Sequence, residues 1–187
     1  MKKILLTVVA ILLIFPAISQ GQELSKKEQR KLQKELKKEQ QAEEAAKKAA
    51  LVDLMVEYRQ FVLEADQLRD KRGNTVNVPS MINFIALDSI HGVIQIGSNQ
   101  YVGMNGVGGI TVEGPISNYK STRNEKSGVY NISYMLRSTT GSYDVRLSIS
   151  PNGRADASVS SNWPGRVNYI GYIVPPATSR VYKGVSY

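Results

Sequence analysis

The part of the chain that decides the fold is residues 143–159, which read YDVRLSISPNGRADASV. On both sides of Asn152-Gly153, apolar residues alternate with polar ones. A period of two places the apolar side chains on one face of a strand, and Asn-Gly between two such runs is a strong hairpin signal. We therefore expect two antiparallel strands here, each with one apolar face. The expected apolar positions are Tyr143, Val145, Leu147, Ile149, Ala155, Ala157 and Val159.

Similar runs extend outward in both directions from this hairpin. Turn signals such as Ser89-Ile90-His91-Gly92 and Trp163-Pro164-Gly165 separate them, and Pro175-Pro176 ends the last run. Seven to nine short strands spaced in this way predict an antiparallel meander. Because each strand has one apolar face, the sheet must close or fold over itself. A small barrel and a flattened sandwich both stay open, and the up-and-down order favours the barrel.

We assign residues 59–187 to this mainly β, barrel-like domain. Two local details are specific enough to be checked. Near its start, Ile82, Phe84 and Ala86 are the expected apolar face of one strand. The segment Phe61–Asp66 fits either a helix or a strand.

Residues 22–58 form a long charged helical segment in this interpretation. Lys, Glu, Gln, Ala and Leu dominate it, and Gly and Pro are absent between Glu23 and Tyr58. The spacing of Leu51, Leu54, Met55, Tyr58 and Val62 is that of a helix face packed on something. We expect this last part to dock and the first half to be solvent-exposed. A partner-binding arm, a spacer and a plain solvated helix stay open as roles.

The N-terminal residues 1–21 have the pattern of a signal peptide. Lys2-Lys3 precede an apolar run from Ile4 to Phe15, and small residues place the cleavage near Ser19 or Gly21. The apolar run is shorter than the roughly 20 residues that a membrane-spanning helix needs. The sequence thus predicts a periplasmic or secreted protein without a stable transmembrane anchor.

Composition excludes several classes of function. The chain has no Cys, so disulfides, cysteine-based zinc sites and thiol nucleophiles are excluded. Its net charge is +8, but the basic excess is mild and dispersed over the chain. A nucleic-acid binder concentrates its basic residues on one face with aromatic residues between them. We therefore expect no nucleic-acid partner, and solubility or weak attraction to anionic surfaces explains the charge better.

The glycine-rich residues 103–114 resemble a phosphate-binding loop at first sight. A dinucleotide fingerprint needs G-x-G-x-x-G between a strand and a helix. Here the spacing differs, and Ile110-Thr111-Val112 favours a strand after the glycines. We expect these glycines to supply positive φ angles, a bulge or close backbone contacts where the sheet bends.

The residues that could carry catalysis do not form a recognisable set. His91 is the only His and lies beside Asp88 in a predicted turn, where a surface role is the commoner one. Strand parity points Glu113, Asp144 and Asp156 outward, so the close carboxylate pair of a glycosidase is not expected. We predict no catalytic, cofactor-binding or metal-binding residues. Tyrosines of the strands suit pocket walls, but they are also ordinary sheet residues.

Several pieces of the sequence resemble the family of exported bacterial proteins known as domain of unknown function 4251. The two specific pieces are residues 105–114, NGVGGITVEG, and residues 181–184, VYKG. The more generic matching pieces are residues 61–66, 83–85, 95–97, 152–155, 169–172 and 179–180. The similarity covers roughly residues 50–187. It implies a compact β-barrel-like domain preceded by a helix in an exported protein, and it implies no catalytic residues.

Together these observations lead to two functional hypotheses. The first is an exported, non-enzymatic β-domain that binds a small ligand or an envelope partner through residues that the sequence does not identify. The alternative is a hydrolase acting on cell-envelope material, which would need two acids, or His91 with an acid, to meet in a cleft.

Overall fold

The structure is a computed structural model that describes residues 26–100, 102–103, 105–161 and 165–186. The chain divides into two units, Met1–Gln40 and Gln41–Tyr187, which are described separately. The predicted signal peptide and the predicted turn at Trp163-Pro164 lie outside the described residues.

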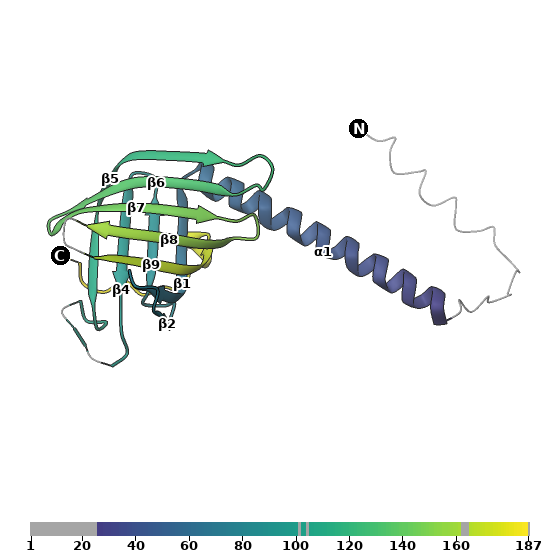
Figure 1. Ribbon diagram of the computed structural model, residues 1–187, viewed down its shortest axis with the longest axis horizontal. Helices are drawn as coiled ribbons and strands as arrows, with labels where there is room; N and C mark the ends of the chain where they lie inside the picture. The colour runs from purple at the N-terminus through teal and green to yellow at the C-terminus, as the bar shows by residue number, and fades with distance from the viewer. Residues whose placement is uncertain (1–25, 101, 104, 162–164, 187) are drawn as a thin grey trace, which may run out of the picture. The chain divides into compact units, whose positions relative to one another are not determined.

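One helix and nine strands make up the described chain, with a short 3-10 helix near its end (Figure 1). Their bounds are α1 Lys26–Glu57, β1 Gln60–Arg69, β2 Thr75–Asn77, β3 Phe84–Asp88, β4 His91–Ile96, β5 Ile110–Arg123, β6 Tyr130–Ser138, β7 Gly141–Ile149, β8 Arg154–Ser161, β9 Arg166–Val174 and η1 Pro176–Thr178. The segment left open between helix and strand is therefore a strand, β1.

The sheet closes into a barrel. Each strand from β3 to β9 pairs antiparallel with the next, and β1 pairs with both β3 and β9. The short strand β2 adds to the far end of β1 as an extra strand. Eight strands in a closed ring confirm the predicted antiparallel meander. Of the two architectures left open, the barrel is the one observed. The β7–β8 hairpin turns at Asn152-Gly153, as expected, with Gly153 at a φ of 85°.

Side chains fill the barrel. An eight-stranded ring has an interior just wide enough for them, and one continuous cluster of buried apolar residues occupies it. The members from the strands include Phe61, Leu63, Ile85, Leu87, Ile132, Leu136, Val145, Leu147, Ala157 and Tyr169. Val52, Met55 and Val56 of α1 join this cluster, so the last turns of the helix close one end of the barrel (Figure 1).

The docking face predicted for the helix was wrong for most of its residues. Of that face only Met55 is buried on the helix, and Leu51, Leu54 and Tyr58 are 43%, 50% and 64% exposed. The helix ends at Glu57, and the chain turns at Arg59 (φ 55°) into β1. Val62 therefore belongs to a strand. The residues that dock beside Met55 are Val52 and Val56, each one residue along from Leu51 and Met55 of the expected stripe.

The predicted apolar face of residues 82–86 was also wrong. Ile85 and Leu87 point into the barrel, while Phe84 and Ala86 lie on its outer face. Phe84 is nevertheless 1% exposed, because another part of the chain covers that face.

The glycine-rich stretch shapes the β4–β5 connection, as the sequence predicted. Gly106 and Gly108 have φ angles of 76° and 77°, which few residues other than glycine adopt. A Cβ atom on Gly109 would lie 2.1 Å from the carbonyl oxygen of Ile96. These glycines are thus required by backbone geometry.

Candidate functional site

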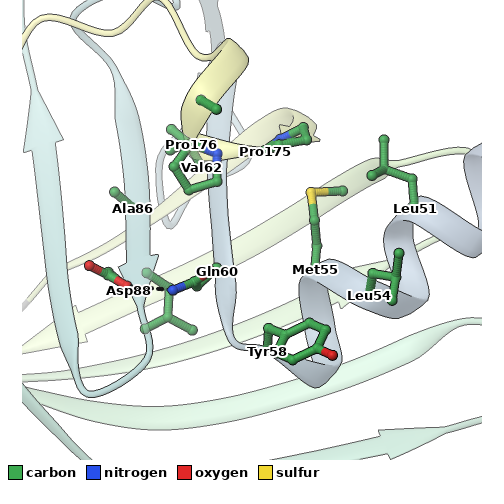
Figure 2. Close-up of a pocket in the computed structure, with 12 residues that line it drawn as sticks. Leu51, Leu54, Met55, Tyr58, Gln60, Val62, Ala86, Asp88, Pro175 and Pro176 are labelled. Carbon is green, nitrogen blue, oxygen red and sulfur yellow. Dashed lines mark hydrogen bonds between the residues drawn. The ribbon is translucent and has the colours of Figure 1, made fainter.

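An apolar groove lies where α1 meets the barrel, and it is the candidate site (Figure 2). Its volume is about 480 Å³. Val62 and Ala86 form the floor, on the outer face of the paired strands β1 and β3. One wall comes from α1 and the other from the segment after β9. The wall residues are Leu51, Leu54, Met55 and Tyr58, and Pro175, Pro176 and Ala177.

The groove follows directly from the docking of the helix. Because Val52 and Val56 are buried in the barrel end, Leu51 and Leu54 are left on the side that faces away from it. Across the groove, Pro175 and Pro176 end β9, since proline cannot donate a hydrogen bond to a continuing ladder. Exposed leucines beside two prolines therefore leave apolar surface uncovered at this junction.

One end of the groove is polar and acidic. The Nε2 atom of Gln60 donates a hydrogen bond of 3.1 Å to Oδ1 of Asp88. Both residues line the groove, and none of its lining residues is Lys or Arg. The groove thus offers an apolar surface with one carboxylate at its end.

Strand pairing brings His91 and two acids together on the outer face of β3, β4 and β5. Asp88 and His91 are direct neighbours across the β3–β4 hairpin. Glu113 faces Val93, two positions along β4 from His91. Of these residues only Asp88 lines the groove. The sequence showed the Asp88–His91 pair but not its proximity to Glu113, which depends on strand register.

The other acids of the sequence prediction lie on the outer face of β7 and β8. Asp144 pairs with Ser160 and Asp156 with Ser148, so four strand positions separate the two carboxylates. At 3.4 Å per residue this is roughly 14 Å, beyond the spacing of a glycosidase pair. Asp156 instead accepts a hydrogen bond of 2.8 Å from Arg69.

The two pieces of sequence most specific to the family resemblance meet in space. The C-terminal segment, which we define as residues 179–186, bonds to Glu64 of β1, Gln95 of β4 and Glu113 of β5 on the outer face of the barrel. Gln95, which is completely buried, anchors this segment to the barrel. Its amide nitrogen donates to the carbonyl oxygens of Ile82 and Tyr182, and its amide oxygen accepts from Thr111 and from the backbone of Gly184.

Asn105 extends this network into the glycine-rich stretch. Its side chain donates to Thr111 and accepts from the backbone nitrogens of Val107 and Gly109. Its carbonyl oxygen accepts a hydrogen bond from Val185 of the C-terminal segment. The glycine-rich stretch and the C-terminal segment are thus joined in one hydrogen-bond network around the buried residues Gln95 and Thr111.

Glu113 also bonds to the C-terminal segment. Its carboxylate accepts a hydrogen bond from Lys183 at 2.5 Å and a second one from the Ser186 hydroxyl. The pKa of Glu113 is lowered, first by the hydrogen bond from Lys183 and next by that from Ser186. A carboxylate whose pKa is lowered by folding stabilises the folded state at pH values above its ordinary pKa. This stabilisation is lost as the pH falls from the ordinary pKa through the lowered pKa of the folded state.

Glu113→Gln should therefore destabilise the protein in a pH-dependent way. We expect a loss of about 1 kcal/mol in the free energy of unfolding at pH 7. The difference from wild type should shrink as the pH falls below about 4.5, where the carboxyl of the unfolded chain takes up its proton, and through the lowered pKa of the folded state. Urea unfolding from pH 3 to pH 7 measures it, with the exposed Glu125→Gln as the control. A difference that stays constant down to pH 3 would contradict this role of Glu113.

Two tyrosines are buried in the barrel with no hydrogen-bond partner for their hydroxyls among the described residues: Tyr134 and Tyr169. Burial raises the pKa of both far above the ordinary value. They are therefore neutral at physiological pH and pack as core residues. Of the other strand tyrosines, Tyr130 and Tyr143 also pack against the core cluster, which fits the sheet role better than the role of a pocket wall.

No metal site or membrane-spanning helix is found in the described part of the chain. Across residues 26–100, 102–103, 105–161 and 165–186, no three His, Asp or Glu side chains gather as metal ligands would. Within those same ranges, no helix combines the length and the apolar character needed to cross a bilayer.

The groove residues were largely missed by sequence reasoning. The spacing of Leu51, Leu54 and Tyr58 predicts buried residues, whereas all three are exposed. Pro175-Pro176 was recognised only as a strand end, and its position opposite α1 depends on the β1–β9 pairing. A pair of prolines directly after the last strand was the one available signal.

The comparisons with known proteins agree with the fold. A family model described as "Domain of unknown function (DUF4251)" matches residues 42–173. Among solved structures, the chain is similar to a DUF4251 family protein from Bacteroides eggerthii DSM 20697. The two are 28% identical with a TM-score of 0.63, and the match covers 76% of this chain and 97% of that one. No match was found among the curated proteins.

Proposed function

The chain belongs to the DUF4251 family, and we propose that it is an exported, non-enzymatic binding domain whose apolar groove holds a segment of an envelope protein. The observation that carries the proposal is the exposed apolar wall formed by Leu51 and Leu54 of α1 and by Tyr58, which follows the helix. This wall faces Pro175 and Pro176 across the groove. The proposed location is the periplasm or the outside of the cell, after cleavage of the predicted signal peptide.

An extended protein segment suits this groove better than an enclosed small ligand. Side chains fill the barrel interior, so a partner's side chains must bind on the outside, and the groove offers them an apolar surface there. It is apolar along its length and acidic at the Asp88 end. The partner segment that we propose therefore carries apolar side chains followed by one Lys or Arg that reaches the Asp88 carboxylate.

Introducing negative charge at the α1 wall of the groove should strongly weaken binding of this partner. The double substitution Leu51→Glu and Leu54→Glu removes two apolar contacts, and burying one such side chain contributes about 1.5–3 kcal/mol. We expect affinity to fall at least a hundredfold in pull-downs from the envelope fraction with purified protein. Stability should change little, because both side chains are about half exposed.

Val76→Glu provides the matched control. Val76 is 57% exposed on β2 and lies outside the groove. If the double variant retained a partner as well as this control does, the groove would not be the binding site.

The alternative function, a hydrolase acting on cell-envelope material, draws on the Asp88–His91 pair beside the groove. In such an enzyme His91 would act as a general base oriented by Asp88. Incubation with peptidoglycan and other envelope polymers distinguishes the two proposals. The binding domain should release no product, whereas product release that disappears in His91→Ala would replace our proposal with the enzyme.

A further inference from the structure

Residues 26–38 of α1 carry seven basic side chains that all lie on one side of the helix. They are Lys26, Lys27, Arg30, Lys31, Lys34, Lys37 and Lys38, which we call the basic stripe. At 3.6 residues per turn they fall within an arc of about 140° and extend over about 18 Å. All seven residues are exposed, and six of them line one continuous shallow surface. Composition alone did not reveal this segregation, because acids are interspersed along the sequence.

The acidic residues of this segment, together with the next residue, Glu39, lie on a different side of the helix. Glu28, Glu35 and Glu39 fall within an arc of about 40°, centred roughly 130° from the middle of the basic stripe. Leu32 and Leu36, each 49% exposed, also lie away from the stripe. This part of the helix thus has a purely cationic face, with its carboxylates and leucines turned elsewhere.

Such a stripe is unfavourable for an isolated helix. Lys27 and Lys31, and likewise Arg30 and Lys34, stand four residues apart with like charges, which destabilises the helix. Of these four residues only Lys31 has an acid four residues on, Glu35. Farther along α1, side chains of opposite charge stand four residues apart, and Glu43 forms an ion pair with Lys47 at 2.7 Å. An anionic partner along the stripe would relieve the repulsion between its lysines.

We propose that the basic stripe holds this protein against the anionic phospholipid surface of a membrane. A helix lying on a flat surface presents one arc of its circumference, and here that arc holds the cations and excludes the carboxylates. Six of the seven residues are lysines, which bind phosphate groups as point charges, and no aromatic residue lies between them for stacking on nucleobases. The leucines face away from the stripe, so the helix binds at the headgroup level without inserting.

This inference rests on residues 26–38 and is independent of the proposed groove. Vesicle co-sedimentation tests it, using the chain as it exists after export. We expect binding to vesicles with 30% phosphatidylglycerol in phosphatidylcholine, no binding to pure phosphatidylcholine, and release in 0.5 M NaCl. Each basic residue near an anionic leaflet is worth roughly a fivefold change in partitioning.

Neutralising three residues of the stripe should therefore weaken binding about a hundredfold. The test variant carries Arg30→Gln, Lys34→Gln and Lys37→Gln, which keep helix propensity high. The control carries Lys71→Gln, Arg72→Gln and Lys126→Gln, which remove the same charge from exposed positions of the barrel unit. Circular dichroism should show equal helix content in both variants.

Three results would overturn the proposal. One is an equal loss of binding in the test and control variants, and another is equal binding to neutral vesicles. The third is tight binding to DNA or heparin without binding to vesicles, which would make the partner a linear polyanion. The Leu51→Glu and Leu54→Glu variant should keep full vesicle binding, so failure of the groove proposal and failure of this one are distinguishable.

Discussion

Alanine at position 171 is expected to unfold the barrel or to destabilise it severely. Gly171 lies in β9 at the seam where the ring closes, paired with Ala65 of β1 and Ala155 of β8. A Cβ atom there would lie 1.9 Å from the carbonyl oxygen of Glu64 and 2.8 Å from the Cα atom of Ala65. Both are backbone atoms, so the strands themselves would have to separate.

We expect a loss of at least about 3 kcal/mol, at the upper end of what overpacking a core costs. This is a large share of the total stability of a small domain. Urea unfolding followed by circular dichroism measures it. Gly165→Ala is the matched control, because a Cβ atom at position 165 meets no atom within 4 Å. Wild-type stability of Gly171→Ala would show that the barrel does not close through β1 and β9 as described.

Replacing Gln95 with alanine should have the second-largest effect. The substitution removes four hydrogen bonds from a completely buried position. It leaves the Gly184 nitrogen and the Ile82 and Tyr182 carbonyl oxygens without the partner they have in the wild type. Each such buried group costs about 1–3 kcal/mol, unless the C-terminal segment lifts off and exposes it to water.

We therefore expect Gln95→Ala to lose about 3 kcal/mol and to release the C-terminal segment. Hydrogen exchange should show this release at the amides of Gly184 and Val185, both of which donate hydrogen bonds in the wild type. Gln67→Ala serves as the control, because the Gln67 side chain bonds only to the exposed Asn77 among the described residues. Unchanged protection at Gly184 would mean that Gln95 does not anchor the segment.

The strand order was predictable because its signals are local. Alternating residues and turn residues such as Asn152-Gly153 act within one hairpin, and the β7–β8 register follows from them. The sequence could not decide between a closed barrel and a sandwich. Closure depends on the pairing of Val62 with Val174, more than a hundred residues away. No local pattern encodes that contact.

The helix face and the buried polar residues were predicted less well, for a similar reason. Residues 51–58 offer two overlapping apolar stripes, and only the position of the barrel end selects Val52 and Val56 over Leu51 and Leu54. Gln95 and Thr111 lie on the outer face of their strands, where the alternation predicts exposure. Their burial depends on the C-terminal segment, which crosses that face from the far end of the sequence.

The groove was missed because it needs three distant segments at once. The end of α1, the β1–β3 pair and Pro175-Pro176 each read as ordinary structure in the sequence. Only their assembly leaves Leu51, Leu54 and Tyr58 exposed beside an apolar floor.

The most direct test of the groove as a binding site is site-specific photo-cross-linking in living cells. A benzophenone amino acid would replace Leu54 in the groove and, as the control, Val76, which is similarly exposed on β2. We predict that position 54 cross-links to another polypeptide and that mass spectrometry maps the adduct to an apolar stretch next to a Lys or Arg. Position 76 should give no such adduct. Equal cross-linking at both positions, or none at position 54 in the folded protein, would contradict the binding function proposed for this family member.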